Sequence, residues 1–242
     1  MTFPAASQSA QPASVLPQPT VVRREDYREP DWLAEGLVLH FALDAQDTVV
    51  TAACRYRRRP GAAADAPLRL DGEALETLGV AIDNRVLPQE SWEQDNGQLV
   101  LRNLPEHFTL HTQVRIHPSA NLELSGLYAT GSTLLTQCEA QGFRRITWFQ
   151  DRPDVMTTYR VILQARRAQY PVLLSNGNLL AADAPAAAEA RSTLSVLTLP
   201  ATDGDWHEAV WEDPFPKPCY LFALVAGNLA VNETRHRLAS GR

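Results

Sequence analysis

The stretch TVVTAACRYRR, residues 48–58, alternates between side chains that suit a core and side chains that suit a surface. A period of two over this length predicts a β-strand with one buried face. Similar alternation occurs in LVLHFAL (37–43), QLVLRNL (98–104) and FTLHTQVRI (108–116). Turn-forming residues separate these stretches, and Asn96-Gly97 is a strong hairpin signal among them. The first half of the chain is therefore predicted to consist of strands joined by turns.

The second half repeats this pattern. Five further strands are predicted, in YRVILQARR (159–167), PVLLSNGNLL (171–180), STLSVLTLP (192–200), HEAVWED (207–213) and CYLFALVAG (219–227). The alanine-rich segment 181–191 is predicted to be a loop. Asp151 followed by Pro153 indicates one short capped helical turn near 151–156. Together these signals predict an all-β fold, a sandwich of large twisted and mostly antiparallel sheets.

The composition is that of an ordinary globular protein with a substantial core, since 45% of the 242 residues are hydrophobic and 21% are charged. A net charge of −6 argues against nucleic acid as a partner, because phosphate binding needs a basic face. No run approaches the roughly 20 apolar residues of a membrane helix. We expect neither a nucleic-acid nor a membrane partner.

The chain is expected to be a single domain with a tail. Residues 1–20 are rich in Pro, Ala, Ser and Gln and lack the pattern of a secretory signal, so they are predicted to be a disordered tail. Residues 21–242 form the predicted β-rich domain. Three widely spaced cysteines without a C-x-x-C motif indicate reduced thiols. We therefore expect a cytoplasmic location.

No catalytic motif emerges from spacing. His207-Glu208 begins like H-E-x-x-H, but the fifth position is Trp211, which cannot ligate zinc, and the segment alternates like a strand. His107 and His111 would lie about 13 Å apart along a strand. The chain has no G-x-S-x-G elbow and no glycine-rich phosphate loop. The spacing predicts neither a metal site nor a nucleophile.

Gln137 and Glu139 flank Cys138 and are the candidate binding residues. If this segment is a strand, both point to the same side, while Thr136, Cys138 and Ala140 face the core. A carboxylate beside an amide offers two acceptors to a protonated amine. A solvent-exposed polar face would also account for the pair, and the spacing alone does not decide.

Two long strings resemble a known family: TQCEAQGFRRITWFQDRPDV (136–155) and DPFPKPCYLFALVAG (213–227). Both are similar to the amino-terminal domain of the bacterial aminopeptidase N family, whose members are gluzincin-type zinc metalloaminopeptidases. The resemblance covers residues 27–242. It implies a saddle-like β structure that covers one side of a catalytic cleft and recognises the substrate.

The resemblance also implies roles for residues. In the family, the glutamate of the Q-C-E-A string holds the free α-amino group of the peptide and the glutamine lines the first-residue pocket. These roles correspond to Glu139 and Gln137. The family's G-x-M-E-N and H-E-x-x-H motifs follow this domain and do not occur in this chain. Zinc is therefore expected in the full-length enzyme and not in this chain.

The expected partners are the N-terminus of a peptide substrate and the catalytic domain that this chain lacks. Alone, the chain is expected to be inactive. It is also expected to self-associate, because a surface that normally packs on another domain would be exposed. The alternative hypothesis is a standalone β-sandwich interaction module without an enzymatic role.

Overall fold

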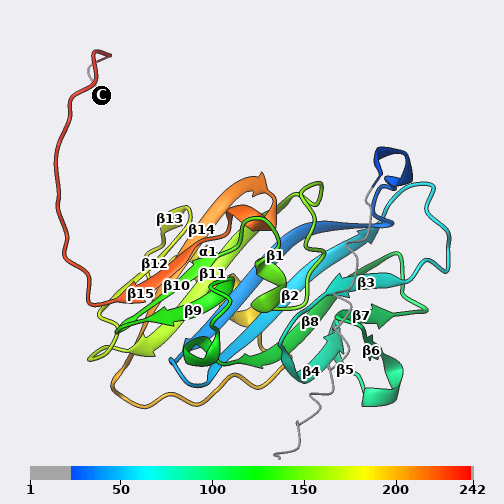
Figure 1. Cartoon of the computed structure of the whole chain (residues 1–242), viewed down its shortest axis with the longest axis horizontal. Helices are drawn as coiled ribbons and strands as arrows, with labels where there is room; N and C mark the ends of the chain where they lie inside the picture. The colour runs from blue at the N-terminus through cyan, green and yellow to red at the C-terminus, as the bar shows by residue number, and fades with distance from the viewer. Residues whose placement is uncertain (1–22, 241–242) are drawn as a thin grey trace, which may run out of the picture.

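The computed structural model describes residues 23–240, which form three β-sheets (Figure 1). The sheets are mostly antiparallel and twisted, which confirms the all-β prediction. The tail predicted at 1–20 lies outside the described residues. Within the described part of the chain, no helix has the length and apolar character needed to cross a membrane.

The largest sheet has eight strands in the order β13-β14-β11-β1-β2-β8-β4-β5. The pair β1 and β11 is parallel, and the other neighbours are antiparallel. The strand bounds are β1 (Trp32–Leu43), β2 (Thr48–Arg58), β4 (Glu76–Ile82), β5 (Arg85–Val86), β8 (His107–Ile116), β11 (Thr157–Arg166), β13 (Asn178–Leu179) and β14 (Trp206–Lys217).

Two smaller sheets complete the fold. One has the order β12-β15-β10-β9 and the other β3-β7-β6. Their strands are β3 (Leu68–Asp71), β6 (Glu93–Asp95), β7 (Gln98–Leu101), β9 (Gly126–Thr130), β10 (Thr133–Gln137), β12 (Val172–Ser175) and β15 (Leu224–Gly227). The predicted hairpin at Asn96-Gly97 joins β6 to β7, and both residues have positive φ, as the tight turn requires.

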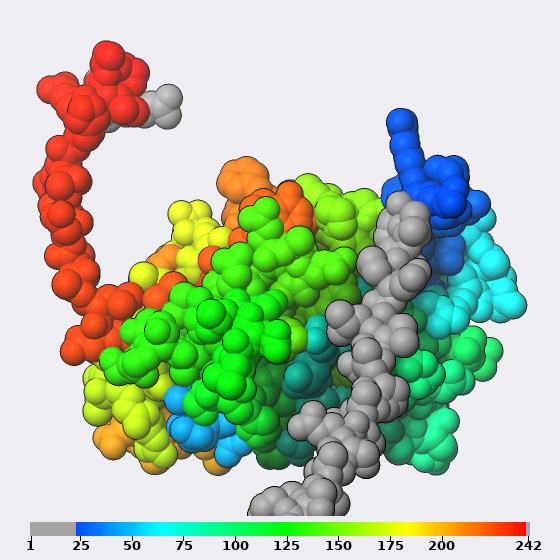
Figure 2. All heavy atoms as spheres, viewed as in Figure 1, coloured from blue at the N-terminus to red at the C-terminus, as the bar shows by residue number. Residues whose placement is uncertain are grey.

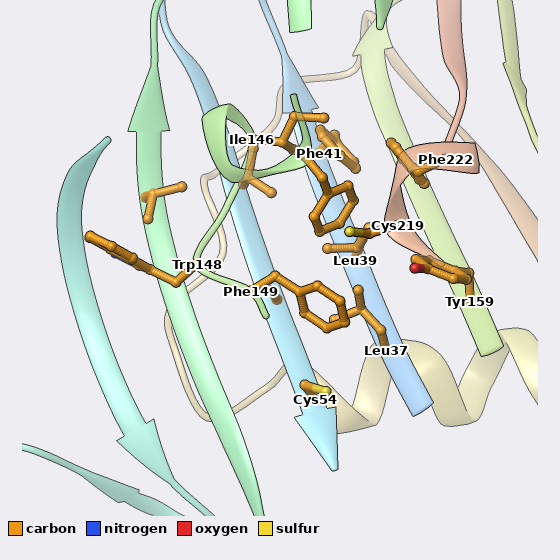
Figure 3. Close-up of a cluster of buried hydrophobic side chains, with 14 of the residues drawn as sticks. Leu37, Leu39, Phe41, Cys54, Ile146, Trp148, Phe149, Tyr159, Cys219 and Phe222 are labelled. Carbon is orange, nitrogen blue, oxygen red and sulfur yellow. The ribbon is translucent and has the colours of Figure 1, made fainter. Parts of the chain in front are cut away.

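The main core lies on the inner face of the large sheet (Figure 3). The alternation that predicted β2 places Val50, Ala52, Cys54 and Tyr56 in this core. Phe143 is fully buried there and packs edge-on against three aromatic rings at centroid distances of 5.3 to 6.5 Å. Those rings belong to Phe149, Tyr159 and Phe222.

The outer face of the large sheet is partly covered by a helix, α1 (Pro185–Thr193). The loop predicted at 181–191 and the strand predicted at 192–200 are therefore wrong. Alanine is the best helix former, and proline is well tolerated in the first turn of a helix. The helix is held by a second small core of Ala53, Ile162, Ala187, Ala190, Leu194 and Val210.

The helical turn predicted near 151–156 is also absent. Residues 153–154 form a turn, closed by a bond from the Val155 N–H to the Arg152 carbonyl (3.2 Å). Asp and Pro favour turns as readily as helix starts, which explains the error. Short 3₁₀ helices occur instead at η1 (Arg24–Asp26), η2 (Gln89–Ser91), η3 (Pro118–Ala120), η4 (Phe143–Arg145) and η5 (Cys219–Leu221).

After β15 the chain leaves the sheets. Residues 230–240 are exposed and have no regular structure apart from a turn at 239–240. Figure 2 shows this segment as an arm that extends away from the body of the molecule.

Candidate functional site

Gln137 and Glu139 lie at the end of β10 and in the turn after it. Gln137 is the last residue of the strand, and Glu139 is in the turn that follows it. Both are exposed, whereas Cys138 between them is buried. The expectation that Ala140 packs into the core is wrong. It is exposed because the strand ends at Gln137 and its alternation does not continue into the turn.

The turn is closed by two hydrogen bonds. The Gln137 side-chain amide donates to the Glu139 carbonyl (3.2 Å), and the Gly142 N–H donates to the Cys138 carbonyl (2.8 Å). A Cβ atom at Gly142 would lie 2.3 Å from the Gln137 carbonyl oxygen, so this position accepts only glycine without a backbone shift. The local sequence thus forces a compact turn that presents the Glu139 side chain to solvent.

A buried carboxylate supports the chain just after this turn. The Asp151 side chain is only 1% exposed. Its Oδ2 atom accepts bonds from the Arg144 backbone N–H (3.2 Å) and from Arg144 Nε (2.9 Å). Its Oδ1 atom accepts the Cys219 thiol at 3.1 Å. The Asp151 N–H in turn donates to Asp71 Oδ2 (3.2 Å), which links the group to β3.

The thiols near the site are structural. Burial raises the pKa of Cys138 to about 12, and the nearby Asp151 carboxylate adds to the shift. The pKa of Cys219 is raised by burial and by the same carboxylate. Both thiols therefore stay protonated at neutral pH, and the Cys219 thiol can act as a donor. Neither cysteine is a nucleophile in this environment.

The histidines considered in the sequence lie in strands of the large sheet. His207 lies in β14, where its Nε2 is 2.8 Å from the Tyr170 carbonyl, and Glu208 pairs with Arg191 at 2.5 Å. His107 and His111 both lie in β8. Among residues 23–240, no group of three or more His, Cys, Asp or Glu side chains could hold a metal ion. The described residues therefore do not fit a zinc site.

The described residues thus present an exposed carboxylate and an exposed amide at this turn and no group of metal-ligating side chains. An exposed carboxylate and amide can accept hydrogen bonds from a cation. That Gln137 and Glu139 bind an amine stays a prediction. Sequence reasoning missed the support from Asp151, which resembled a helix cap, because Cys219 lies 68 residues away along the chain.

Comparisons with known proteins agree with this architecture. The model of the peptidase M1 N-terminal domain matches residues 37–221. Aminopeptidase N of Escherichia coli (strain K12) is 44% identical over 93% of this chain and 23% of its own length. Aminopeptidase N of Caulobacter vibrioides is 42% identical over 93% of this chain and 24% of its length. The chain thus spans about a quarter of these relatives.

Solved structures show the same fold. Aminopeptidase A of Legionella pneumophila, in complex with aspartic acid, superposes over 90% of this chain and 24% of its own, with a TM-score of 0.77 and 30% identity. Leukotriene A4 hydrolase of Saccharomyces cerevisiae covers 90% of this chain and 33% of its own, with a TM-score of 0.65 and 16% identity, which shows the fold alone. Because the family model matches more than half of this chain, the chain belongs to the peptidase M1 N-terminal domain family.

Proposed function

We propose that this chain is the substrate-recognition domain of a zinc-dependent aminopeptidase, and that Glu139 and Gln137 bind the free amino group of the peptide. One observation carries the proposal: both side chains are exposed at one compact turn after β10, in a chain 44% identical to an aminopeptidase N. The wider protein would remove residues from the N-termini of peptides.

The physical basis is charge selection. A free α-amine has a pKa of about 7.7–8.0 and is largely protonated at neutral pH. A blocked or internal peptide nitrogen carries no charge. When a peptide covers Glu139, a cationic amine stabilises the Glu139 carboxylate, whereas a neutral peptide nitrogen leaves that carboxylate unpaired. The same contact would fix the distance between the amine and the scissile bond.

The hydrolytic chemistry would belong to another part of the protein. Because the described residues offer no zinc ligands, we propose that the metal is held by a catalytic domain that packs against this one. When bound, zinc would activate water for attack on the peptide bond. The isolated chain would then be inactive, and the complete enzyme would act in the cytoplasm.

A kinetic comparison tests the role of Glu139. In the complete enzyme, Glu139→Ala should lower kcat/KM for a free-amine substrate by about 30-fold, which corresponds to roughly 2 kcal/mol of transition-state binding. An analogue without the amine should be affected little. Glu90→Ala, which changes an exposed glutamate in η2, is the matched control. A fall in melting temperature that accounts for the lost activity would contradict the proposal.

A surface property supports a second domain as partner. Several large apolar side chains of β13, β14 and η5 are exposed: Phe215 is 74% exposed, Leu179 60% and Leu221 50%. We propose that the catalytic domain covers them in the complete protein, and that the isolated chain self-associates through them. Sedimentation should show dimers or larger species that diminish in Phe215→Ser. A monomer at high concentration would contradict the self-association.

A further inference from the structure

The turn that carries Glu139 has few anchors of its own. Its two ends are fixed by the burial of Cys138 and Phe143 in the core. Between them, Ala140 and Gln141 are exposed. The described side-chain contact within the turn is the one from Gln137 to the Glu139 carbonyl. The direction of the Glu139 carboxylate therefore depends on how firmly the flanking backbone is held.

Asp151 contacts the backbone after the turn directly, and the segment before the turn only through Cys219 and β15. On one side it binds the backbone and the guanidinium of Arg144, at the centre of η4 and two residues after Gly142. On the other side it accepts the thiol of Cys219, at the start of η5. The chain after η5 enters β15, which pairs with β10 at Leu135↔Val225, and β10 ends at Gln137. One buried carboxylate thus links the segments before and after the turn.

The surroundings favour a fixed geometry over a mobile one. Cys219 lies in the aromatic core beside Phe222 and Tyr159 (Figure 3). The Asp151 carboxylate has three donors for its two oxygens, and a buried charge with satisfied hydrogen bonds has little freedom to reorient. Arg144 is held further by Asp71, whose Oδ2 lies 4.0 Å from its guanidinium, and its carbonyl accepts the Glu73 N–H at 2.9 Å.

We infer that Asp151 is a positioning residue for amine recognition: through Arg144 and Cys219 it sets the direction of the Glu139 carboxylate without touching the substrate. The inference rests on the proposed function of Glu139. Asp151 would then contribute to selectivity as well as to stability. If the turn is loosened, the Glu139 carboxylate can rotate into solvent and no longer holds the amine in place. A small displacement of a positioning group is enough to reduce discrimination.

The variants separate charge from shape. Asp151→Asn keeps the shape but replaces one acceptor with a donor, so it must oppose either the Arg144 donors or the Cys219 thiol. Arg144→Gln removes the guanidinium from the partly exposed end of the pair and keeps the backbone N–H. The matched control is Arg145→Gln, because Arg145 is adjacent and binds Glu73 instead of Asp151. Cys219→Ser retains a donor, and Cys219→Ala removes it.

Two readouts are measured. In the complete enzyme, the ratio of kcat/KM between a free-amine substrate and its analogue without the amine should fall about tenfold in Asp151→Asn and Arg144→Gln. It should stay within about twofold of wild type in Arg145→Gln and Cys219→Ser. In the 242-residue chain, amide hydrogen exchange of residues 138–145 should accelerate in the same two variants, while helix α1, on the other face of the large sheet, keeps its protection.

The outcomes are distinct. If Glu139→Ala lowers the ratio but Asp151→Asn and Arg144→Gln do not, the inference is overturned and the proposed function stands. An unchanged ratio in Glu139→Ala overturns the proposed function, and the inference with it. If Asp151→Asn does not fold, Arg144→Lys, for which the same fall is expected, decides instead, because it keeps a cation beside the buried Asp151 carboxylate but replaces the fixed guanidinium with one flexible donor.

Discussion

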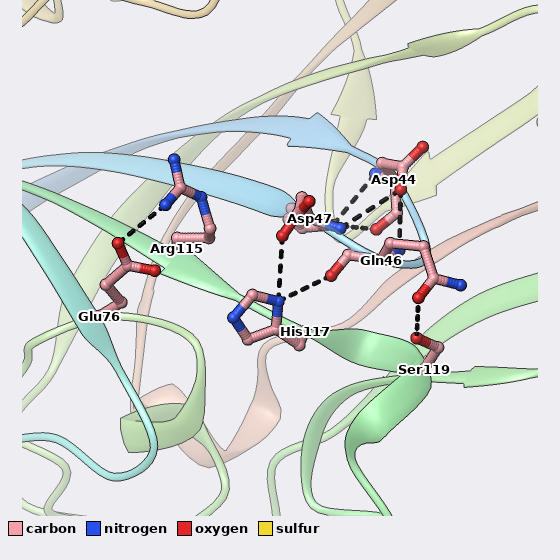
Figure 4. Close-up of polar contacts among 8 residues, drawn as sticks. Asp44, Gln46, Asp47, Glu76, Arg115, His117 and Ser119 are labelled. Carbon is pink, nitrogen blue, oxygen red and sulfur yellow. Dashed lines mark hydrogen bonds and ion pairs between the residues drawn. The ribbon is translucent and has the colours of Figure 1, made fainter.

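Two clusters of polar side chains tie distant segments of this chain together, and they differ chiefly in burial. The cluster around Asp151 links η4, β3 and η5 in the core, and the Asp151 side chain is 1% exposed. The other lies at the β1–β2 turn (Figure 4). There His117 Nδ1 is 2.8 Å from the Gln46 carbonyl and 3.1 Å from Asp47, whose side chain is 65% exposed.

The contact distances are alike, but the energetic consequences are not. Around an exposed cluster, water replaces any partner that is removed, so each contact contributes little to the free energy of unfolding. Around a buried cluster, a group that loses its partner keeps the full cost of its desolvation. Contact distance therefore does not show which polar network stabilises the fold, whereas burial does.

The largest effect is expected from Asp151→Ala. It leaves the Cys219 thiol and the Arg144 N–H without acceptors. It also removes the carboxylate partner of the Arg144 guanidinium, and the Arg144 side chain is 23% exposed. Because that guanidinium can still reach water, the loss should be near the low end for a broken buried pair, about 3 kcal/mol. Chemical denaturation measures it, with Asp47→Ala as the exposed counterpart, expected to lose less than about 1 kcal/mol. Equal losses in the two variants would refute the distinction.

Gly142→Ala should have the next largest effect. The added methyl would sit 2.3 Å from the Gln137 carbonyl oxygen and 2.9 Å from the Gly126 nitrogen, so the backbone must move. Overpacking of this kind destabilises by about 2 kcal/mol. Gly204→Ala is the control, because a Cβ there would meet nothing within 4 Å. A Gly142→Ala variant as stable as Gly204→Ala would mean that the turn is free to adjust.

The sequence predicted what depends on local pattern. Alternation identified most strands, and Asn96-Gly97 identified a hairpin, because both signals act over a few residues. Gln137 and Glu139 are proposed together because they are two residues apart in the sequence, and their role stays a prediction. The helix α1 was missed because its apolar positions are alanines, whose burial against Ile162 and Val210 becomes evident only once the sheet is formed.

The Asp151 cluster could not be predicted for the same reason. Its carboxylate binds Arg144, seven residues away, and Cys219, 68 residues away, and nothing in the intervening sequence marks the second partner. A lone buried cysteine is usually a small apolar residue, so its thiol gave no sign of a hydrogen bond. Local signals predicted the exposed pair, and only the tertiary structure showed what supports it.

The pH dependence of stability provides a third test of burial. Burial lowers the pKa of His40, whose Nε2 lies 2.9 Å from Gln164 Oε1. The unfolded chain, with a pKa near 6.5, then binds more protons than the folded one, so stability is present above about pH 6.5 and is lost as the pH falls below it. One such group accounts for at most about 1.4 kcal/mol per pH unit.

His40→Gln should therefore reduce the loss of unfolding free energy between pH 7 and pH 5.5. Denaturation at several pH values measures this loss. His111, whose pKa is also lowered by burial, would sustain part of the remaining dependence. An unchanged pH profile in His40→Gln would show that this histidine is not held neutral by the fold.

The smallest effect is expected at an ion pair beside the exposed cluster. Arg115 and Glu76 join β8 to β4 at 2.8 Å, and their side chains are 36% and 50% exposed (Figure 4). Water and salt screen this pair, so Arg115→Gln should change the unfolding free energy by no more than about 0.5 kcal/mol. Half a molar salt should shrink even that difference, because it shortens the screening length to a few ångströms. A loss as large as that of Asp151→Ala would mean that the cross-strand position of the pair outweighs its exposure, and burial would no longer be a sufficient guide to which polar contacts hold this fold.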